Sequence, residues 1–403
     1  MKPLESYNLF DPATAENPFE YYAALRERAP VYQMPVGMWI VASHAQCLEA
    51  MRDPGTFSSR FMQKMMGGAP RDESGRIAGP ETLLSNDPPS HTYFRKLVNK
   101  AFSPNRVKKI SSSICTIGED LLARFEKRGQ FEAVAEFAVP LPLTVIADQL
   151  GVPRDHLAEF KRWSDATVVP LGGMATPDEL RESVVLTLEL QQYLIERCEE
   201  RRVEPSDDLL SDLVHAELDG ERPLETAEVV SLLQQFLVAG NETTTNLIAA
   251  ALQFLLQHPD QLARVRADRE LLPNAIEESI RLETPVCGMW RVTTRDVELG
   301  DAKIPEGSMV MLRYAAANRD EAVFADAERF DVGRDNAREH LGFGMGIHYC
   351  PGAALAREEA RIGLGLLLDG LSNLRLAQGN DFAHQRSMLL RGLVRLDLEF
   401  DPS

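Results

Sequence analysis

The chain has 403 residues, of which 44% are hydrophobic and 26% charged, a composition typical of a globular protein whose core is large enough to enclose a sizeable ligand. Its formal net charge of −18 argues against nucleic acid as a partner, because phosphate binding needs a basic surface. Five scattered cysteines without a C-x-x-C pair argue against a disulfide framework and a structural zinc site, and no apolar signal core or anchor opens the chain. We therefore expect a cytoplasmic protein with reduced thiols and no membrane contact.

Alternating patterns predict strands near both ends of the chain, and helical periodicity dominates from about residue 105 to 285. The strand patterns are VYQMPVGMWIVAS (31–43) and VELGDAKIPEGSMVMLRYAA (297–316). Residues 60–82 and 167–177 predict long loops of the kind that act as lids. No repeat or long Gly/Ser linker divides the chain, so we expect a single, mainly α-helical domain over residues 1–403 with small β-sheets at its margin.

A basic stretch, residues 91–109, departs from the acidic average of the chain. It contains no acidic residue and six basic ones: Arg95, Lys96, Lys100, Arg106, Lys108 and Lys109. Taken alone, such a run is most simply a solvated helix face.

Residues 228–259 predict a helix of about thirty residues, or roughly 45 Å at 1.5 Å per residue, which is long enough to cross the whole domain. The polar residues near its middle exclude a membrane span; they are Gln234, Gln235, Asn241 and Glu242. Helix propensity gives no reason for Gly-Asn-Glu-Thr-Thr-Thr (240–245) at this position, because glycine and β-branched threonine weaken helices. An exposed polar patch is the simplest alternative, but apolar runs continue on both sides. The segment therefore predicts a function.

The next segment, EESIRLETPV, holds Glu278 and Arg281 three residues apart on one helix face, where they can pair. Alone, this spacing is most common as a surface pair.

The segment LGFGMGIHYCPGAAL (341–355) places Cys350 behind two glycines and a histidine and in front of proline and glycine. The glycines permit sharp turns beside a flat object, and Pro351 suits the first turn of a helix, whose N-terminus favours the thiolate of Cys350. A buried structural cysteine and a zinc ligand paired with His348 are the alternatives, but zinc would need further ligands at suitable spacing. A single thiolate on a glycine loop suits an iron that a porphyrin already holds.

These segments resemble the cytochrome P-450 family of haem-thiolate monooxygenases, in particular its soluble bacterial type. The F-G-x-G-x-H-x-C-x-G pattern matches in full at Phe343, Gly344, Gly346, His348, Cys350 and Gly352, and the resemblance covers nearly all of the chain. It implies the P-450 fold, with haem b (iron protoporphyrin IX) between a long central helix and the C-terminal cysteine loop and helix. It also implies that Cys350 is the axial ligand of the haem iron.

The resemblance assigns roles to the other segments as well. In Ala239-Gly240-Asn241-Glu242-Thr243-Thr244, small residues would make room for dioxygen, while Glu242 and Thr243 relay protons. Glu278 and Arg281, with Arg329 in AERFD as third member, would hold the scaffold of the cysteine loop. The groups expected to bind the haem propionates are His91 and Arg95 in SNDPPSHTYFR, Arg291 and His348. The amides of Gly352 and Ala353 would point at the sulfur of Cys350, whereas Pro351 has no N–H to offer.

The resemblance also places a substrate pocket where variable loops meet the haem. Its candidate residues are mostly apolar and rich in methionine, which suits an adaptable apolar site, although a core role is as plausible for each. They are Phe61, Met62, Met65, Met66, Phe236, Ala239, Val286, Met289, Met388 and Leu389.

From the resemblance we expect a monomeric enzyme that inserts one atom of O2 into a small-to-medium apolar organic substrate. Its electrons would come from NAD(P)H through a separate ferredoxin reductase and ferredoxin, since the residues after Cys350 leave no room for a reductase domain. An acidic ferredoxin would dock on the basic stretch near Lys100, Lys108 and Lys109. Two alternatives stay open. One is a peroxygenase driven by hydrogen peroxide, against which Glu242 and Thr243 argue, and the other is a non-catalytic haem-binding sensor or carrier, which would have little use for that acid and alcohol.

Overall fold

The structure, a computed structural model, describes residues 2–65, 83–216 and 222–402, and for Lys100, Ala101 and Pro104 it describes the backbone only. Met66 and most of the loop expected over residues 60–82 lie outside the described residues. The other expected loop, residues 167–177, contains one short 3-10 turn, η4 (Val169–Gly172).

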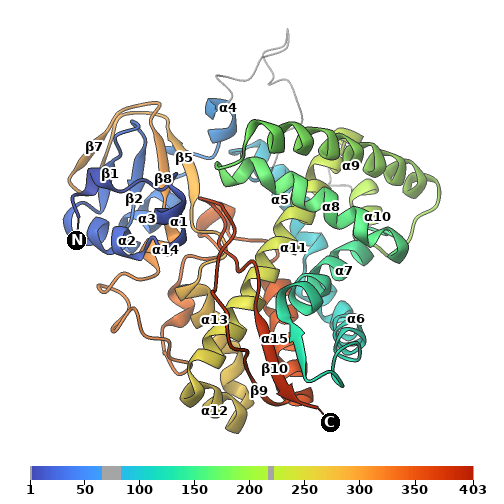
Figure 1. The fold of residues 1–403 in the computed structure, drawn as a ribbon. Helices are drawn as coiled ribbons and strands as arrows, with labels where there is room; N and C mark the ends of the chain where they lie inside the picture. Colours follow the sequence, from blue (N-terminus) through green and yellow to red (C-terminus); the bar gives the residue numbers. More distant parts are fainter. Residues whose placement is uncertain (1, 66–82, 217–221, 403) are drawn as a thin grey trace.

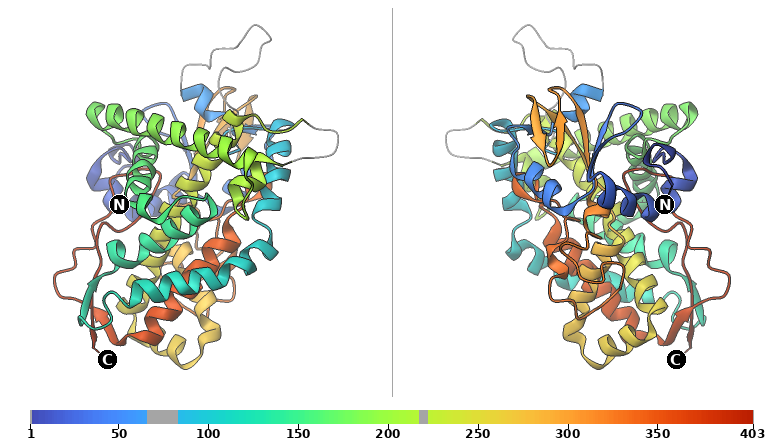
Figure 2. Two further views of the ribbon diagram at one scale, coloured as in Figure 1. Left: turned by 90° about the vertical axis from the view of Figure 1, so that its right-hand side faces the viewer. Right: turned by 90° about the vertical axis from the view of Figure 1, so that its left-hand side faces the viewer.

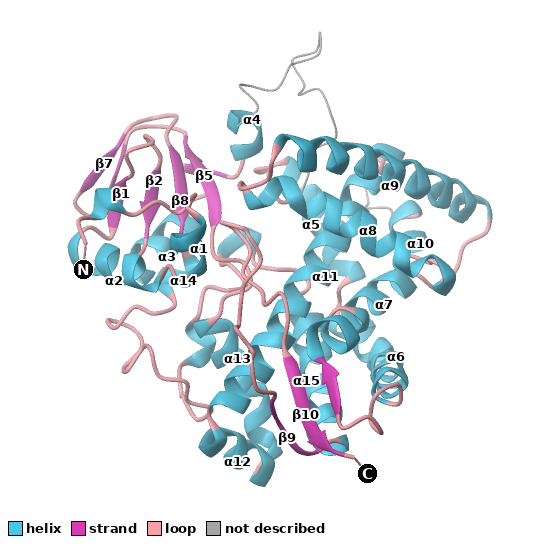
Figure 3. Ribbon diagram, in the orientation of Figure 1, coloured by secondary structure: helices cyan, strands magenta, loops and turns pink. Residues whose placement is uncertain are grey.

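Helices make up most of the molecule, as the periodicity predicts (Figures 1 and 3). They are α1 (Pro12–Glu16), α2 (Phe19–Arg28), α3 (His44–Arg52), α4 (Phe61–Met65), α5 (Ser90–Ala101), α6 (Pro104–Leu122), α7 (Pro140–Gln149), α8 (Leu157–Val168), α9 (Pro177–Val203), α10 (Leu209–Val214), α11 (Thr226–Gln257), α12 (Pro259–Ala267), α13 (Leu272–Leu282), α14 (Tyr314–Ala317) and α15 (Ala353–Gly370). None of the described helices is long and apolar enough to cross a membrane.

The strands form three small sheets at the margin of the helical body. The strands are β1 (Val31–Gln33), β2 (Trp39–Val41), β3 (Phe57–Ser58), β4 (Gln130–Glu132), β5 (Met289–Thr293), β6 (Val297–Leu299), β7 (Ala302–Ile304), β8 (Met309–Leu312), β9 (Ser372–Leu376) and β10 (Asp397–Asp401). The sheet orders are β1-β2-β8-β5-β3, β4-β10-β9 and β6-β7. In both side views of Figure 2, the C-terminus that follows β10 lies at the bottom of the molecule, far from the strands of the five-stranded sheet.

The five-stranded sheet joins the N-terminal strands β1, β2 and β3 to β5 and β8, which come from residues 289–312. β2 runs parallel to β8 with Trp39 opposite Val310, and β5 runs antiparallel to β8 with Met289 opposite Leu312. This pairing places Arg291 on β5, one of the expected propionate ligands, in a sheet that also contains β8 and the N-terminal strands β1, β2 and β3.

The central helix is α11, which spans 32 residues and begins with a capping box formed by Glu225 and Glu228. It passes through the middle of the molecule in Figure 1, and most of its side chains are buried. One apolar core lies between α11 and the helices α6, α7, α13 and α15, and a second one lies between α11 and α5, α7, α8, α9 and α10. Other helices pack on both sides of α11, so its centre does not face bulk solvent. A residue that is exposed there must therefore face a space inside the protein.

Candidate functional site

The cysteine loop, residues 341–352, folds back on itself before α15 begins. Gly344 and Gly346 adopt φ angles of 69° and 68°, which side chains rarely allow, and a Cβ on Gly346 would lie 2.6 Å from the Met51 carbonyl oxygen. The Cys350 amide donates to the carbonyl of Phe343 at 2.8 Å and closes the loop. Gly352 is the N-cap of α15, so the helix begins at Ala353. The expectation that Pro351 lies in its first turn is wrong by two residues, since Pro351 occupies the turn before the cap.

The thiol of Cys350 lies in an environment with two opposing influences. Burial raises its pKa, while the amides of Gly352 and Ala353 and the charges of Arg95 and Arg357 act in the opposite direction. The two amides are those expected to point at the sulfur. The Cys350 sulfur is therefore expected to stay protonated while nothing is bound to it. It is expected to lose the proton and become a thiolate when a metal cation binds.

Arg357 is a member of this site that the motifs did not reveal. Its guanidinium lies over the ring of Phe343, 4.3 Å from the ring centroid, and pairs with Glu277 through contacts of 2.6 and 3.0 Å. Burial of the Glu277 carboxyl is outweighed by hydrogen bonds from His340 and Arg357, which lower its pKa to about 2. Phe343 thus packs against Arg357, whose positive charge favours the thiolate of Cys350. The spacing of the glycines does not predict this role of Phe343.

Four basic residues that lie far apart in the sequence come together near the cysteine loop. The rings of His91 on α5 and His348 have centroids 4.2 Å apart. Burial, and then the charges of Arg291, His91 and Arg95, lower the pKa of His348 to about 3. All four expected propionate ligands are therefore neighbours, and their mutual repulsion is a reason for the site to bind anions.

Other contacts orient the two histidines. Ser59 Oγ and His348 Nε2 lie 2.9 Å apart, and the Asn86 backbone also hydrogen-bonds His348. The Nε2 atom of His91 is buried and has no hydrogen-bond partner within the described part of the protein. A buried polar atom of this kind needs a partner, and a carboxylate of a bound group would provide one. No pattern in the sequence pointed to Ser59 or Asn86.

The centre of α11 has an open face and a buried one. Ala239 is exposed and Gly240 and Thr243 are half-buried, in the middle of a helix that is otherwise enclosed. The Thr243 hydroxyl donates to the Ala239 carbonyl at 2.5 Å. Space beside small residues on a packed helix is what a flat cofactor with a small ligand requires.

The side chain of Glu242 is buried and does not lie on the open face of α11. Burial raises its pKa, and the side chains of Gln385 and Asn246 and the charge of Lys161 oppose that rise. Among the described residues no hydrogen bond joins Glu242 to Thr243, so the two side chains expected to act together are adjacent in sequence but separate in surroundings.

The E-x-x-R pair is confirmed as a contact, but its expected third member is wrong. Arg281 donates to Glu278 through contacts of 2.7 and 2.8 Å, and both side chains are fully buried. Arg329 contributes its backbone carbonyl, which accepts from Arg281 at 3.2 Å, while the residue itself is exposed. The arginine that binds Glu278 is Arg334, at 2.9 Å and with its side chain almost fully buried, and the backbone amide of Asp331 donates to the same carboxylate at 3.2 Å.

The expected pocket residues are only partly brought together. Phe61, Met388 and Leu389 are buried in one apolar cluster, against which Met289 packs, and Val286 pairs with Leu390 in an isolated bridge. Met62 and Met65 are exposed.

Phe236 packs in a different apolar cluster from Phe61, Met388 and Leu389. It belongs to the core cluster of α5, α7, α8, α9 and α10 and makes an edge-to-face contact with Phe102, with centroids 4.9 Å apart. Phe236 therefore has a packing role in the core, and its contact with a substrate stays a prediction.

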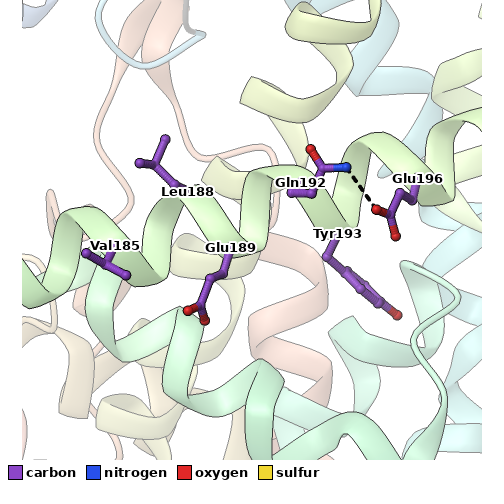
Figure 4. A pocket seen from close by; sticks show the side chains of 6 residues that line it. All are labelled: Val185, Leu188, Glu189, Gln192, Tyr193 and Glu196. Atoms are coloured by element: carbon purple, nitrogen blue, oxygen red, sulfur yellow. Dashed lines mark hydrogen bonds between the residues drawn. The ribbon is translucent and has the colours of Figure 1, made fainter.

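A hollow lies along α9, lined by Val185, Leu188, Glu189, Gln192, Tyr193 and Glu196 (Figure 4). None of these residues belongs to the motifs, and α9 carries no expected site residue. We assign the hollow no part in the chemistry.

The basic stretch is less uniform than its composition indicates. Lys96, Lys108 and Lys109 are exposed, as a docking surface requires. Arg106 instead pairs with Asp207 and Asp212, each at 3.2 Å, and so ties α6 to the region of α10. Lys100 lies in α5, and its side chain is outside the description.

Comparison with known proteins agrees with this arrangement. A family model described as Cytochrome P450 matches residues 176–391. Cytochrome P450 107B1 of Saccharopolyspora erythraea is 39% identical over 399 residues, which are 96% of each chain. Vitamin D(3) 25-hydroxylase of Pseudonocardia autotrophica is 36% identical over 406 residues, which are 99% of this chain and 97% of the relative. The solved structure of cytochrome P450 CYP109Q5 from Chondromyces apiculatus matches with a TM-score of 0.88 at 38% identity over 100% of both chains. The resemblance drawn from the sequence, and the fold it implied, are confirmed.

Proposed function

The chain belongs to the cytochrome P450 family, binds haem b and is a haem-thiolate monooxygenase, and from that premise we propose that it inserts one atom of O2 into a small-to-medium apolar organic substrate. When bound, the haem supplies the iron at which dioxygen is activated. Electrons come from NAD(P)H through a separate ferredoxin reductase and an acidic ferredoxin, which docks on the exposed lysines of the basic stretch.

The observation that carries the proposal is the setting of Cys350. Two backbone amides and two arginine charges favour the thiolate, and burial alone keeps the free thiol protonated. Once it has lost this proton, Cys350 would hold the haem iron through its sulfur. The amides of Gly352 and Ala353 would stabilise the negative charge on this sulfur.

The cluster of His91, Arg95, Arg291 and His348 binds the two haem propionates. Its support is electrostatic: the charges that act on His348 are all positive, and His91 has a buried nitrogen without a partner. Two carboxylates would satisfy these groups and raise the pKa of His348. Binding and orienting the haem is therefore the work of residues from α5, β5 and the cysteine loop together.

Thr243 and Glu242 deliver protons to the open face of α11. The Thr243 hydrogen is engaged with the Ala239 carbonyl, so its oxygen is free to accept a hydrogen bond from a donor on that face. Glu242, whose pKa is raised by burial, holds a proton more readily than an exposed glutamate does. Its Oε1 atom has no hydrogen-bond partner in the described part of the chain, so a bound water molecule is needed to pass its proton to the open face.

The substrate is apolar because the expected pocket residues are. Phe61, Met388 and Leu389 offer buried apolar surface, and the neighbouring Met289 adds a side chain that adapts to ligand shape. A relative that is 36% identical is a vitamin D(3) hydroxylase, so vitamin D(3) is a reasonable first compound to test.

The test is product formation by the haem-loaded protein with ferredoxin, ferredoxin reductase and NADH, over a panel of apolar compounds that begins with vitamin D(3). Hydroxylated product that requires all three electron-transfer components supports the proposal. Product formed only with hydrogen peroxide would identify a peroxygenase. Compounds that shift the Soret band but are not oxidised under either condition would contradict a catalytic role and indicate a carrier.

A further inference from the structure

An exposed stripe of side chains runs along α9, on the side that faces away from the rest of the protein. The opposite side of the helix packs on the protein, and Leu190, Leu194 and Cys198 are buried there. The stripe contains eight residues, which are all exposed and whose numbers rise in alternating steps of three and four. They are Asp178, Arg181, Val185, Leu188, Gln192, Ile195, Glu199 and Arg202. We call them the α9 stripe.

The spacing of the α9 stripe is that of a coiled-coil seam. Steps of three and four residues repeat every seven, which keeps one line of side chains against a second helix over a length of roughly 36 Å. A straight helix drifts by about 20° per heptad from such a seam, so contact is closest at its middle.

The middle of the α9 stripe is apolar. Val185 is 56% exposed, Leu188 58% and Ile195 38%, and Figure 4 shows Val185, Leu188 and Gln192 following one another along the helix. No described segment of the chain covers these side chains. Apolar surface gathered along one exposed helix face is typical of a site that another helix covers.

The charges at the two ends of the α9 stripe indicate what that other helix is. Asp178 and Arg181 form an ion pair at one end, and Glu199 and Arg202 form one at the other, at 2.6 Å. Because the spacing is the same in both directions, a second α9 can run antiparallel along the first, about a two-fold axis midway between residues 188 and 192. Asp178 then lies opposite Arg202 of the second copy, and Arg181 lies opposite Glu199. A parallel arrangement would instead bring like charges together.

The same antiparallel arrangement also matches the apolar residues. Val185 lies opposite Ile195 of the second copy, and Leu188 lies opposite Gln192. The head of Gln192 donates to Glu196 at 2.8 Å, beside the stripe, so its methylene groups are left to contact leucine. The two-fold axis repeats each contact, and a surface that matches itself in this way closes into a dimer and not a longer assembly.

Three glutamates beside the stripe oppose association. They are Glu182, Glu189 and Glu196, of which Glu189 is held on α8 by Arg162 at 3.2 Å and by Trp163 Nε1 at 3.1 Å. The net charge of −18 acts in the same direction. One helix pair also makes a small interface, so we expect a dimer that dissociates on dilution.

We propose that the α9 stripe binds a second copy of this chain, with the two α9 helices antiparallel about the two-fold axis. This dimer differs from the monomer expected from the family resemblance. It is independent of which substrate the enzyme takes and of which protein supplies its electrons.

The test is sedimentation velocity of the haem-loaded protein at physiological ionic strength, where long-range repulsion is screened. We expect the sedimentation coefficient to rise from that of a monomer to that of a dimer between about 1 and about 300 µM protein, the range for an interface of this size. Leu188→Glu should raise the dissociation constant by about tenfold or more, because it places a charge in the apolar middle. Val36→Glu, at a residue that is 59% exposed and far from α9 in sequence, should leave the dissociation constant unchanged.

Two charge reversals test the antiparallel arrangement. Arg181→Glu puts a carboxylate opposite Glu199 of the second copy, and Glu199→Arg puts a cation opposite Arg181, so each should weaken the dimer severalfold. The double variant restores opposite charges and should associate more tightly than either single variant. All three positions that carry a substitution in α9 are exposed, so haem content should stay constant throughout.

A protein that stays monomeric over the whole concentration range overturns the inference. A dimer that Leu188→Glu leaves intact also overturns it, because the contact then lies elsewhere. A double variant that associates no more tightly than Arg181→Glu and Glu199→Arg overturns the antiparallel arrangement.

Discussion

The hydroxyl of Thr243, at the centre of the long helix α11, has a proposed role in proton transfer. Its hydrogen bond to Ala239 is a local one, of the kind that threonine makes in many helices, and it slightly weakens the helix. The hydroxyl lies beside open space, because its neighbours on the same face are the exposed Ala239 and the half-buried Gly240. Replacing Thr243 with alanine removes a hydrogen-bond acceptor from that space and little packing.

In Thr243→Ala we expect haem content and substrate affinity to stay close to their original values. Product formed per NADH should fall by roughly tenfold or more, with the missing electrons recovered as hydrogen peroxide, because positioned proton transfer is lost. The measurement is product, NADH and peroxide in the same assay. Thr243→Ser, which keeps a hydroxyl, should retain most of the coupling. An unchanged ratio of product to NADH in Thr243→Ala would show that the hydroxyl takes no part.

His348 gives a prediction about pH. In the protein without haem the pKa of His348 is about 3, well below the ordinary value of 6.5. Between pH 3 and pH 6.5 this histidine therefore binds a proton more readily in the unfolded chain than in the folded one. Stability must therefore fall as the pH drops from about 6.5 toward 3. Bound propionates raise the pKa of the folded state and reduce this loss. Urea unfolding of apoprotein and haem-loaded protein across that range checks both statements. His348→Gln should flatten the pH dependence of the apoprotein, and equal slopes in the apoprotein and its His348→Gln variant would contradict the account.

At the scale of secondary-structure elements, α13 and the segment that follows α14 are joined by a buried ion cluster. Glu278 on α13 accepts from Arg281 on the same helix and from Arg334 in the segment that leads to the cysteine loop. A carboxylate without solvent needs both cations, because an unpaired buried charge is costly.

The cluster distinguishes two arginines that look equivalent in sequence. Arg334→Ala leaves the Glu278 charge partly unpaired, so we expect a loss of about 3–5 kcal/mol in the free energy of unfolding, together with weaker haem retention. Arg329→Ala removes an exposed side chain and should cost less than about 0.5 kcal/mol, since its carbonyl remains. Denaturant unfolding and haem content of both variants provide the comparison. A larger loss for Arg329→Ala than for Arg334→Ala would restore the assignment made from sequence.

The same region shows which features of the site could be predicted from sequence. The pairing of Glu278 with Arg281, the length of α11 and the turns of the cysteine loop depend on residues that are close in the chain, so spacing and residue type suffice. The contacts of Arg334 and Arg357 depend on how distant segments pack, and no local pattern carries that information. The contact of Phe236 with Phe102 could not be predicted for the same reason, because Phe102 lies in a distant part of the chain.

For the molecule as a whole, a net charge of −18 means that an acidic partner is repelled except where basic side chains gather. Lys108 and Lys109 are exposed in the basic stretch, whereas Arg106 is neutralised by two aspartates from elsewhere in the fold. Attraction between exposed charges acts mainly on the rate of association and weakens with salt.

Charge reversal at Lys108 or Lys109 should therefore slow reduction by an acidic ferredoxin severalfold at low ionic strength and flatten its salt dependence. Stopped-flow reduction kinetics at several salt concentrations measure both effects. Lys303→Glu is the matched control, because it reverses an exposed lysine on β7, outside the basic stretch. Reduction rates that respond equally to all three reversals would mean that only net charge matters and that no docking site exists at the basic stretch.

The central claim, that Cys350 is the thiolate ligand of the haem iron, has a direct spectroscopic test. The reduced, haem-loaded protein is exposed to carbon monoxide, and the position of its Soret band is recorded in fresh, undenatured samples. We predict the strongly red-shifted band that gives the cytochrome P450 family its name, and its loss in Cys350→His. A Soret maximum typical of histidine-ligated haem in the unmodified protein, or a red-shifted band that persists in Cys350→His, would contradict the claim.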